Sequence, residues 1–434
     1  MKKTLLTICL VWMCFSLSAQ KIIDLSGKWS FSIDRQDNGE KEKWFSHTLN
    51  DFINLPGSMP EKQKGDEVTA KTQWTGSLYD SSYYYNPYME KYRKEGNIKF
   101  PFFLTPDKHY VGAAWYQKEV NIPADWKGER ILLFLERPHI ETTVWVNGQK
   151  TGMQNSLCVP HQYDITHYVR PGKCTITIRV DNRIKEINVG PDSHSITDQT
   201  QGNWNGIVGR ICLQTTPKTY FDDIQIYPEP EQKLARVKVV IKGTGTAKVK
   251  LSAESFNTDK KHIVPAIQQE IKLNKGVTET EMVLPMGNDM LLWDEFHPAL
   301  YKLKAEVTNG KKTEIKEIQF GMRRFEIKGK WFYVNGRKTQ LRGTVENCDF
   351  PLTGYAPMDV ESWERVFRIC RSYGLNHMRF HSFCPPEAAF MAADRVGFYL
   401  QPEGPSWPNH GPKLGLGQPI DKYLMDETIA LTKE

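Results

Sequence analysis

The pattern of apolar and polar residues divides the chain into regions of different period. From about residue 20 to residue 217, short segments alternate between apolar and polar positions and are separated by turn residues, as is typical of β-strands. Five such segments are SGKWSFSID, AAWYQKEVNI, RILLFLER, TTVWVNGQ and CTITIRVDN. Asn147-Gly148 follows an apolar stretch and supplies two residues that tolerate the positive φ of a hairpin turn. We predict a jelly-roll β-sandwich over residues 20–217.

Alternating segments continue from residue 218 to residue 320. They are DDIQIYPE, ARVKVVIKG, AKVKLSAES, TETEMVLP and YKLKAEVTN. Five or more strands in about 100 residues, joined by polar turns, indicate an immunoglobulin-like β-sandwich. Few of its residues suggest chemistry, so we interpret this region as a spacer.

The spacing of apolar residues along the chain changes after Gly321. The hairpin FEIKGKWFYVNGR and the short strand TQLRG precede DVESWERVFRICRSYG, in which apolar residues recur at helical spacing up to a C-capping Gly374. The strand LNHMRF, the helix PEAAFMAADRVG, the strand FYLQPE and the helical segment IDKYLMDETIALTKE follow. This alternation indicates a parallel sheet, and we predict that residues 321–434 hold the first three strand–helix units of a (β/α)8 TIM barrel.

The first 19 residues differ from the rest of the chain. Lys2 and Lys3 precede a mostly apolar run from Leu5 to Phe15, and small residues follow up to Ala19. This order predicts a secretory signal peptide over residues 1–19 and therefore an exported protein, periplasmic or extracellular. The apolar run is shorter than the ~20 residues of a membrane span, so we expect no membrane insertion.

Composition and charge exclude several classes of partner. The 434 residues carry a net charge of +6, and loss of Lys2 and Lys3 lowers it to +4. Basic residues form no run, so we expect no nucleic-acid partner. The six cysteines after residue 19 show neither CxxC pairs nor zinc-ligand spacing, and we expect them to be thiols rather than disulfides.

Polar residues follow each predicted barrel strand. Glu346, Asn347 and Asp349 come after the first strand. Active sites of (β/α)8 barrels form at the carboxyl ends of the strands, so these residues and those after the next two strands are candidates for binding substrate. The residues after the second and third strands are Arg379, His381, Ser382, Glu403 and Trp407.

Structural roles compete with binding at these positions. His381 is as well explained by a structural hydrogen bond as by contact with substrate. Arg379 is expected to pair with an acid such as Glu403, which would order the site whether or not either residue touches substrate. Residues 74–110 also hold tyrosines, which would either stack on sugar rings or pack the insertion onto a neighbouring domain. These tyrosines are Tyr79, Tyr83, Tyr84, Tyr85, Tyr88 and Tyr92.

The order of the three regions resembles glycoside hydrolase family 2, which includes β-galactosidases, β-glucuronidases and β-mannosidases. The resemblance covers almost the whole chain after residue 19. In the first region it rests on AAWYQKEVNIP, VWVNGQKTG, YDIT and GNWNGIVGRI, and in the third on FEIKGKWFYVNGRKTQLRG and YGLNHMRFHSFCPP. It implies an oligosaccharide or polysaccharide substrate. By position, Arg379 matches the family's arginine after the second strand and Glu403 its acid after the third.

Two motifs depart from the family pattern. Where the family commonly has Asn-x-His-Glu, this chain reads Val345-Glu346-Asn347-Cys348, and where it has Arg-x-Ser-His, this chain reads Arg379-Phe380-His381-Ser382. Galactose or glucuronate specificity is therefore not implied. Some relatives bind a cation near the barrel mouth, but the replaced first motif does not support a divalent cation here, and we predict no cofactor and no metal ligand.

The resemblance also implies catalytic residues that we do not find. Family members use an acid/base glutamate in an Asn-Glu pair after the fourth strand and a nucleophile after the seventh, as retention of configuration requires. We therefore expect the amino-terminal part of an exported retaining β-glycosidase, inactive alone. A non-catalytic carbohydrate-binding protein built on the sandwiches is the alternative, and a structural or interaction protein is a weaker one. The sugar, its linkage and the oligomeric state stay open.

Overall fold

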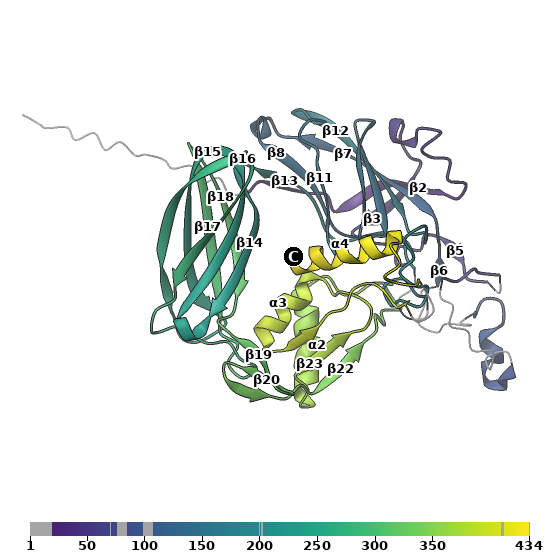
Figure 1. Cartoon of the computed structure of the whole chain (residues 1–434). Helices are drawn as coiled ribbons and strands as arrows, with labels where there is room; N and C mark the ends of the chain where they lie inside the picture. Colours follow the sequence, from purple (N-terminus) through teal and green to yellow (C-terminus); the bar gives the residue numbers. More distant parts are fainter. Residues whose placement is uncertain are drawn as a thin grey trace, which may run out of the picture.

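The computed structural model describes residues 20–69, 71–75, 85–98, 107–198, 200, 203–408 and 412–433. Two β-rich units lie on either side of a smaller region of strands and helices (Figure 1). The amino-terminal unit is coloured purple to blue, the second unit teal, and the strand–helix region green to yellow. The last of these regions provides the candidate site, and both β units contact it.

The amino-terminal unit is a sandwich of two antiparallel sheets. One sheet has the order β1-β13-β8-β11, with β4 also paired to β13, and the other has the order β10-β9-β12-β7-β2-β3. The first sheet consists of β1 (Ile22–Asp24), β4 (Gly57–Ser58), β8 (Arg130–His139), β11 (His161–Asp164) and β13 (Gly206–Thr216). The second consists of β2 (Gly27–Asp34), β3 (Asp51–Leu55), β7 (Ala113–Ile122), β9 (Glu141–Val146), β10 (Gln149–Asn155) and β12 (Gly172–Asp181).

Apolar alternation forms the core of this sandwich. Inward-facing residues such as Phe31, Tyr116 and Leu133 are fully buried and pack in one cluster. The pair β5 (Asp66–Glu67) and β6 (Lys108–His109) and the short 3-10 helices η1 (Trp44–Ser46), η2 (Pro87–Tyr92) and η3 (Ala124–Trp126) complete the unit. Of the tyrosine insertion, Tyr79, Tyr83 and Tyr84 lie outside the described residues, whereas Tyr85 and Tyr88 are 84% and 85% exposed.

The strands of the second β unit differ from those expected from sequence, because two of them are 23 residues long and the last one was not among the expected segments. Its sheet has the order β14-β15-β17-β18, with β16 paired to β15. Its elements are β14 (Tyr220–Glu229), η4 (Pro230–Gln232), β15 (Leu234–Phe256), β16 (Ile263–Pro285), β17 (Leu300–Asn309) and β18 (Lys312–Phe320). The segments ARVKVVIKG and AKVKLSAES, predicted as two strands, belong to the single strand β15. Its pairing register shifts between Gly243 and Gly245, both at positive φ, so the strand bends there without ending.

The carboxyl-terminal region starts with the antiparallel sheet β19 (Phe325–Lys328), β20 (Trp331–Val334) and β21 (Arg337–Thr339). A parallel sheet then follows, with the order β22 (Gly343–Glu346), β23 (His377–Phe380) and β24 (Tyr399–Gln401). Helices α2 (Val360–Ser372), α3 (Glu387–Val396) and α4 (Pro419–Lys433) alternate with these strands. Asp359 caps α2 by accepting a 2.8 Å hydrogen bond from the Ser362 amide, and Gly397 ends α3 at φ 75°.

Hydrogen bonds attach the second β unit to this region. The indole of Trp293 donates to the Asp394 carbonyl in α3 over 2.7 Å, and the guanidinium of Arg371 in α2 donates to the Glu295 carbonyl over 2.6 Å. Trp293 is completely buried. The unit thus contacts α2 and α3 near their carboxyl-terminal ends.

A buried ion network fixes the end of β12, from which the chain runs towards the candidate site. The carboxylate of Asp181 accepts from Arg179 (3.0 Å), Arg183 (2.6 Å) and Lys185 (2.9 Å). Asp37 binds the same two arginines over 2.6 and 2.7 Å. These cations hold the pKa of the Asp181 carboxyl well below its usual range, despite burial.

Neutralising Asp181 is expected to destabilise the sandwich. Asp181→Asn leaves buried guanidinium groups without a full counter-charge, at a cost of about 3 kcal/mol. The free energy of unfolding in urea, followed by tryptophan fluorescence, measures this loss. Asp125→Asn is the control, because Asp125 pairs with Lys21 at the surface and its removal should leave the free energy of unfolding almost unchanged. Equal effects of the two substitutions would contradict a structural role for the buried network.

Candidate functional site

The carboxyl ends of the three parallel strands lie at one edge of the sheet. Glu346, the last residue of β22, is in register with Phe380 in β23, and Arg379 is in register with Gln401 in β24. The His381 amide continues this ladder by donating to the Glu346 carbonyl over 2.9 Å. Side chains that follow the strands therefore start from neighbouring points, as parallel pairing requires. We call this edge the mouth.

Arg379 and Glu403 form an ion pair across the mouth. Nε of Arg379 lies 2.5 Å from Oε1 of Glu403, and the Ser382 amide donates to Oε2 over 2.8 Å. Both carboxylate oxygens are thus held by a donor. Ser382 is at φ 51°, in the left-handed region, which turns its amide towards the carboxylate. The pairing of Arg379 with an acid after the third strand, predicted from sequence, is confirmed.

Aromatic rings lie beside this ion pair. The ring centroids of His381 and Trp407 are 4.7 Å apart, and the His194 ring lies 4.6 Å from His381 and 5.4 Å from Trp407. Burial lowers the pKa of His194 to about 4, and burial with the Arg379 charge lowers that of His381. Both imidazoles are neutral near pH 7. The cluster presents ring faces of the kind that pack against the C–H face of a sugar.

His194 belongs to a segment of the jelly-roll unit that sequence reasoning missed. Hydroxyls of Ser193 and Ser195 donate to the carbonyls of Pro405 (2.7 Å) and Ser382 (2.8 Å). The Ser382 hydroxyl in turn accepts from the His194 amide over 2.8 Å. Residues 192–198 read DSHSITD, a polar run that shows no strand period although its side chains are buried. That run, directly before GNWNGIVGRI, is the only signal that could have singled it out.

Close packing fixes this segment against the loop after β24. The Trp407 amide donates to the Val189 carbonyl over 3.0 Å. Gly190 is at φ 97°, and a Cβ there would lie 2.3 Å from the Trp407 carbonyl oxygen. Only glycine suits this position, both for its backbone conformation and for the space. The jelly-roll unit therefore forms one wall of the mouth.

The residues at the end of β22 and directly after it are not part of the Arg379–Glu403 ion pair or of the ring cluster. Burial raises the pKa of the Glu346 carboxyl, which also accepts from the Asp349 amide over 3.3 Å. Burial likewise raises the pKa of Asp349, and Oδ1 of Asn347 is buried without a hydrogen-bond donor in the described part of the chain. The structure thus brings Arg379, His381, Glu403 and Trp407 together and connects Glu346 to them through the backbone. Their use in binding substrate stays a prediction.

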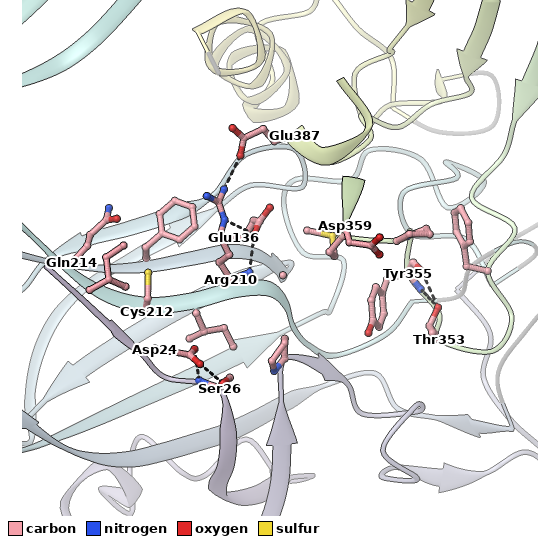
Figure 2. Close-up of a pocket in the computed structure, with 18 of the residues that line it drawn as sticks. Asp24, Ser26, Glu136, Arg210, Cys212, Gln214, Thr353, Tyr355, Asp359 and Glu387 are labelled. Carbon is pink, nitrogen blue, oxygen red and sulfur yellow. Dashed lines mark hydrogen bonds and ion pairs between the residues drawn. The ribbon is translucent and has the colours of Figure 1, made fainter. Parts of the chain in front are cut away.

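A cleft, which we call the outer cleft, lies outside the mouth, between the jelly-roll sheet and the loop that connects β22 with α2 (Figure 2). Its volume is about 1150 Å³. The guanidinium of Arg210 bridges Glu136 (2.9 Å) in β8 and Glu387 (2.7 Å) in α3, as Figure 2 shows. Tyr355 also lines the cleft and donates to Glu61 over 3.0 Å. These contacts dock the loops of the strand–helix region on the sandwich.

Among residues with a described position, no group of three or more His, Cys, Asp or Glu side chains is placed to hold a metal ion. No helix in the described ranges has the length and apolar character needed to cross a membrane.

Comparisons with known proteins agree with this architecture. The family model "Glycosyl hydrolases family 2, sugar binding domain" matches residues 22–217, and "Glycosyl hydrolases family 2" matches residues 219–323. Together they cover more than half of the chain. The fold and the mouth define a multidomain glycoside hydrolase architecture, and the chain belongs to glycoside hydrolase family 2.

Curated relatives include enzymes with two sugar specificities. The chain is 24% identical to a β-galactosidase of Thermoanaerobacter pseudethanolicus, over 73% of this chain and 42% of the relative. It is 24% identical to human β-glucuronidase, over 88% of this chain and 57% of the relative. It is also 27% identical to a putative β-glucuronidase of Formosa agariphila, over 70% of this chain and 36% of the relative. The chain thus spans about a third to three fifths of the length of these relatives.

Solved structures share the fold. A β-glucuronidase from Ruminococcus gnavus in complex with D-glucaro-d-lactam superposes with a TM-score of 0.67 at 20% identity, over 95% of this chain and 63% of that chain. A family 2 member from Bacteroides cellulosilyticus superposes with a TM-score of 0.66 at 19% identity, over 95% of this chain and 50% of that one. At these identities the likeness concerns the fold alone.

Proposed function

We propose that the chain supplies the sandwich domains and the first strands of the (β/α)8 barrel of an exported retaining β-glycosidase. Its substrate would be an oligosaccharide or polysaccharide with a β-O-glycosidic bond. The acid/base and nucleophile glutamates would belong to later strands of the barrel, beyond the residues of this chain. The observation that carries the proposal is the ordered mouth, where an Arg379–Glu403 pair follows two adjacent parallel strands in a chain of family 2.

The chemistry of the mouth suits substrate positioning. Glu403 is a carboxylate held by two donors, and a fixed acceptor of this kind can orient sugar hydroxyls without reorganising. Trp407 and His381 offer apolar ring faces, which bind the C–H faces of a pyranose ring. In this proposal Glu346, Asn347, Arg379, His381, Glu403 and Trp407 bind substrate, and none of them attacks the anomeric carbon.

Removing the Glu403 charge tests the proposal. In a protein extended through the complete barrel, Glu403→Gln should lower kcat/KM for the preferred aryl β-glycoside by about 10²-fold, because Arg379 loses its counter-charge and the fixed acceptor is gone. The preferred substrate is first chosen among galactoside, glucuronide and mannoside. Glu387→Gln is the matched control, because that glutamate pairs with Arg210 at the outer cleft, and kcat/KM should stay within about twofold. Equal kcat/KM for the two variants would contradict a role for Glu403 in the site.

A non-catalytic carbohydrate-binding protein is the second candidate. Tyr85 and Tyr88 favour it, because their rings are almost fully exposed and available to stack on sugars. A glycan array probed with the 434-residue chain distinguishes the two functions. Binding that is lost in a Tyr85→Ala/Tyr88→Ala variant and is indifferent to Glu403→Gln supports this candidate and counts against the first.

Export is part of the proposal and rests on the charged and apolar residues before Gln20. In a bacterial host, the mass of the mature protein recovered from the periplasm or medium should correspond to cleavage near residue 19. Retention of an uncleaved protein in the cytoplasm would count against export.

A further inference from the structure

A small cavity lies between the jelly-roll unit and the barrel loops, next to the outer cleft, with which it shares Tyr355 and Met358. Its volume is about 40 Å³, which is room for one water molecule or one small ion. Residues of β8 and β13 line one side, and residues that follow β22 and β23 line the other. Whatever occupies it contacts both domains.

Two N–H donors at this cavity have no acceptor. Nε of Arg137 and Nε1 of Trp204 are buried and make no hydrogen bond to any described residue. Trp204 is 3% exposed, and its indole stacks on the His139 ring at 4.5 Å. A buried N–H without an acceptor destabilises the folded state, so two at one cavity indicate an occupant that accepts hydrogen bonds.

The guanidinium of Arg137 also has no ion-pair partner. Within the described ranges, no carboxylate lies within 4.0 Å of its nitrogens. Nη1 donates instead to the carbonyls of Leu157 (2.9 Å) and Cys384 (3.1 Å). Glu427 of α4 is in electrostatic range, but it does not line the cavity, and burial raises its pKa towards the neutral form. A partly desolvated positive charge therefore faces the cavity with little compensation.

The other lining groups favour an anion over water. No Asp or Glu is among the lining residues, and burial lowers the pKa of His139 to about 3, so this imidazole is neutral. The rest of the lining is sulfur and hydrocarbon, including Cys348, Met358 and Phe383, with the hydroxyls of Ser195 and Tyr355. A water molecule could accept from both N–H groups but would have only these hydroxyls and Nε2 of His139 for its own hydrogens. A halide needs donors only.

Cys348 explains how such a site can exist. It occupies the position of the glutamate in the family's Asn-x-His-Glu motif, and it is buried, at φ 61°. Cys348 and Arg137 both line the cavity. With cysteine in place of glutamate, residue 348 itself supplies no negative charge to the cavity, and the nearby Glu346 carboxyl is not among its lining residues.

We propose that a monovalent anion of the size of chloride binds between Arg137 and Trp204 and joins the jelly-roll unit to the barrel loops. The anion takes the place of a carboxylate that the sequence does not provide. This inference is independent of the proposed glycosidase activity, because it concerns how the domains are held together. Binding to the folded state alone would make stability depend on chloride concentration.

Replacing Cys348 tests the proposal with a matched pair of variants. Cys348→Asp is close in volume, suits a left-handed residue and places a carboxylate beside Arg137, whereas Cys348→Asn has the same shape without the charge. The unfolding midpoint is measured at pH 7 and constant ionic strength while chloride replaces gluconate from 1 to 100 mM. We expect a saturable rise of about 2–5 °C in the native chain and in Cys348→Asn, and none in Cys348→Asp.

Bromide provides a direct view of the site. Crystals of the native chain grown in bromide should show an anomalous peak between Nε of Arg137 and Nε1 of Trp204, and crystals of Cys348→Asp should not. A midpoint that does not respond to chloride, a chloride response that persists in Cys348→Asp, or a water molecule in place of bromide would each overturn the proposal.

Discussion

Hydrolysis of aryl β-glycosides by the purified 434-residue chain should not exceed the uncatalysed rate. Retaining glycosidases need two carboxyl groups about 5–5.5 Å apart, one to protonate the leaving oxygen and one to attack the anomeric carbon. In the described part of the mouth, Glu403 is committed to Arg379 and to the Ser382 amide, and the family's Asn-Glu pair is absent from the sequence. Because enzymes accelerate such reactions by at least about 10⁶-fold, the difference from a complete enzyme is unmistakable.

This prediction is checked by measuring the release of nitrophenol from nitrophenyl β-galactoside, β-glucuronide and β-mannoside. A protein extended through the complete barrel is the positive control under the same conditions. Turnover by the 434-residue chain above the buffer rate, and lost on Glu403→Gln, would show that the chain contains a complete catalytic site, contrary to the proposed function.

Mild acid should destabilise the folded chain strongly through histidines that are buried in their neutral form. The raised pKa values of carboxyls such as Glu346 and Glu427 act in the opposite direction. His139 and His161 are buried with pKa values lowered to about 3, and His194 with a pKa lowered to about 4. All three are lowered mainly by burial, from an unfolded value near 6.5. The folded state therefore binds fewer protons than the unfolded state. Stability is complete above pH 6.5 and falls as the pH decreases towards 4.

The slope of the free energy of unfolding against pH follows from the difference in the number of protons bound by the unfolded and folded states. Each buried neutral histidine contributes about 1.4 kcal/mol per pH unit, and three contribute about 4 kcal/mol per pH unit in the lower part of this window. The lowered pKa of Asp181 adds its own loss only below about pH 4. Urea unfolding at several pH values measures the slope directly.

His194→Gln should reduce this slope by about one proton, and His167→Gln, a substitution at an exposed position, is the control. If the free energy of unfolding is constant from pH 6.5 to 4.5, or if the two substitutions have the same effect on the slope, the claim that these histidines are buried in their neutral form is wrong.

The sequence predicts the parts of the fold that depend on local period. Alternation of apolar and polar residues indicates the strands of both β units. The change to helical spacing after Gly321 indicates α2, α3 and the parallel strands with which they alternate along the chain. The continuous strand β15 was missed, because Gly243 and Gly245 resemble a turn in sequence but form a bend within a ladder. Turn chemistry alone does not distinguish these outcomes.

The candidate site also contains residues that the sequence predicts and residues that it does not. Arg379 and Glu403 were predicted to pair because both follow parallel strands, and the structure confirms the pair. The segment around His194 was not predicted, because its partners Ser382 and Trp407 lie about 190 to 210 residues further along the chain. A loop without periodicity carries no local sign of such contacts. The anion site required the positions of unpaired donors, which only the folded chain reveals.

A crystal structure of a protein extended through the complete barrel, with a bound glycosidase inhibitor, tests the central claim most directly. We predict a sugar ring at the mouth, with hydroxyls within 3.2 Å of Glu403 or Arg379 and a ring face towards Trp407. An inhibitor bound only on the sandwich domains, with the Arg379–Glu403 pair untouched, would contradict the proposal that this chain provides the substrate side of a glycosidase site.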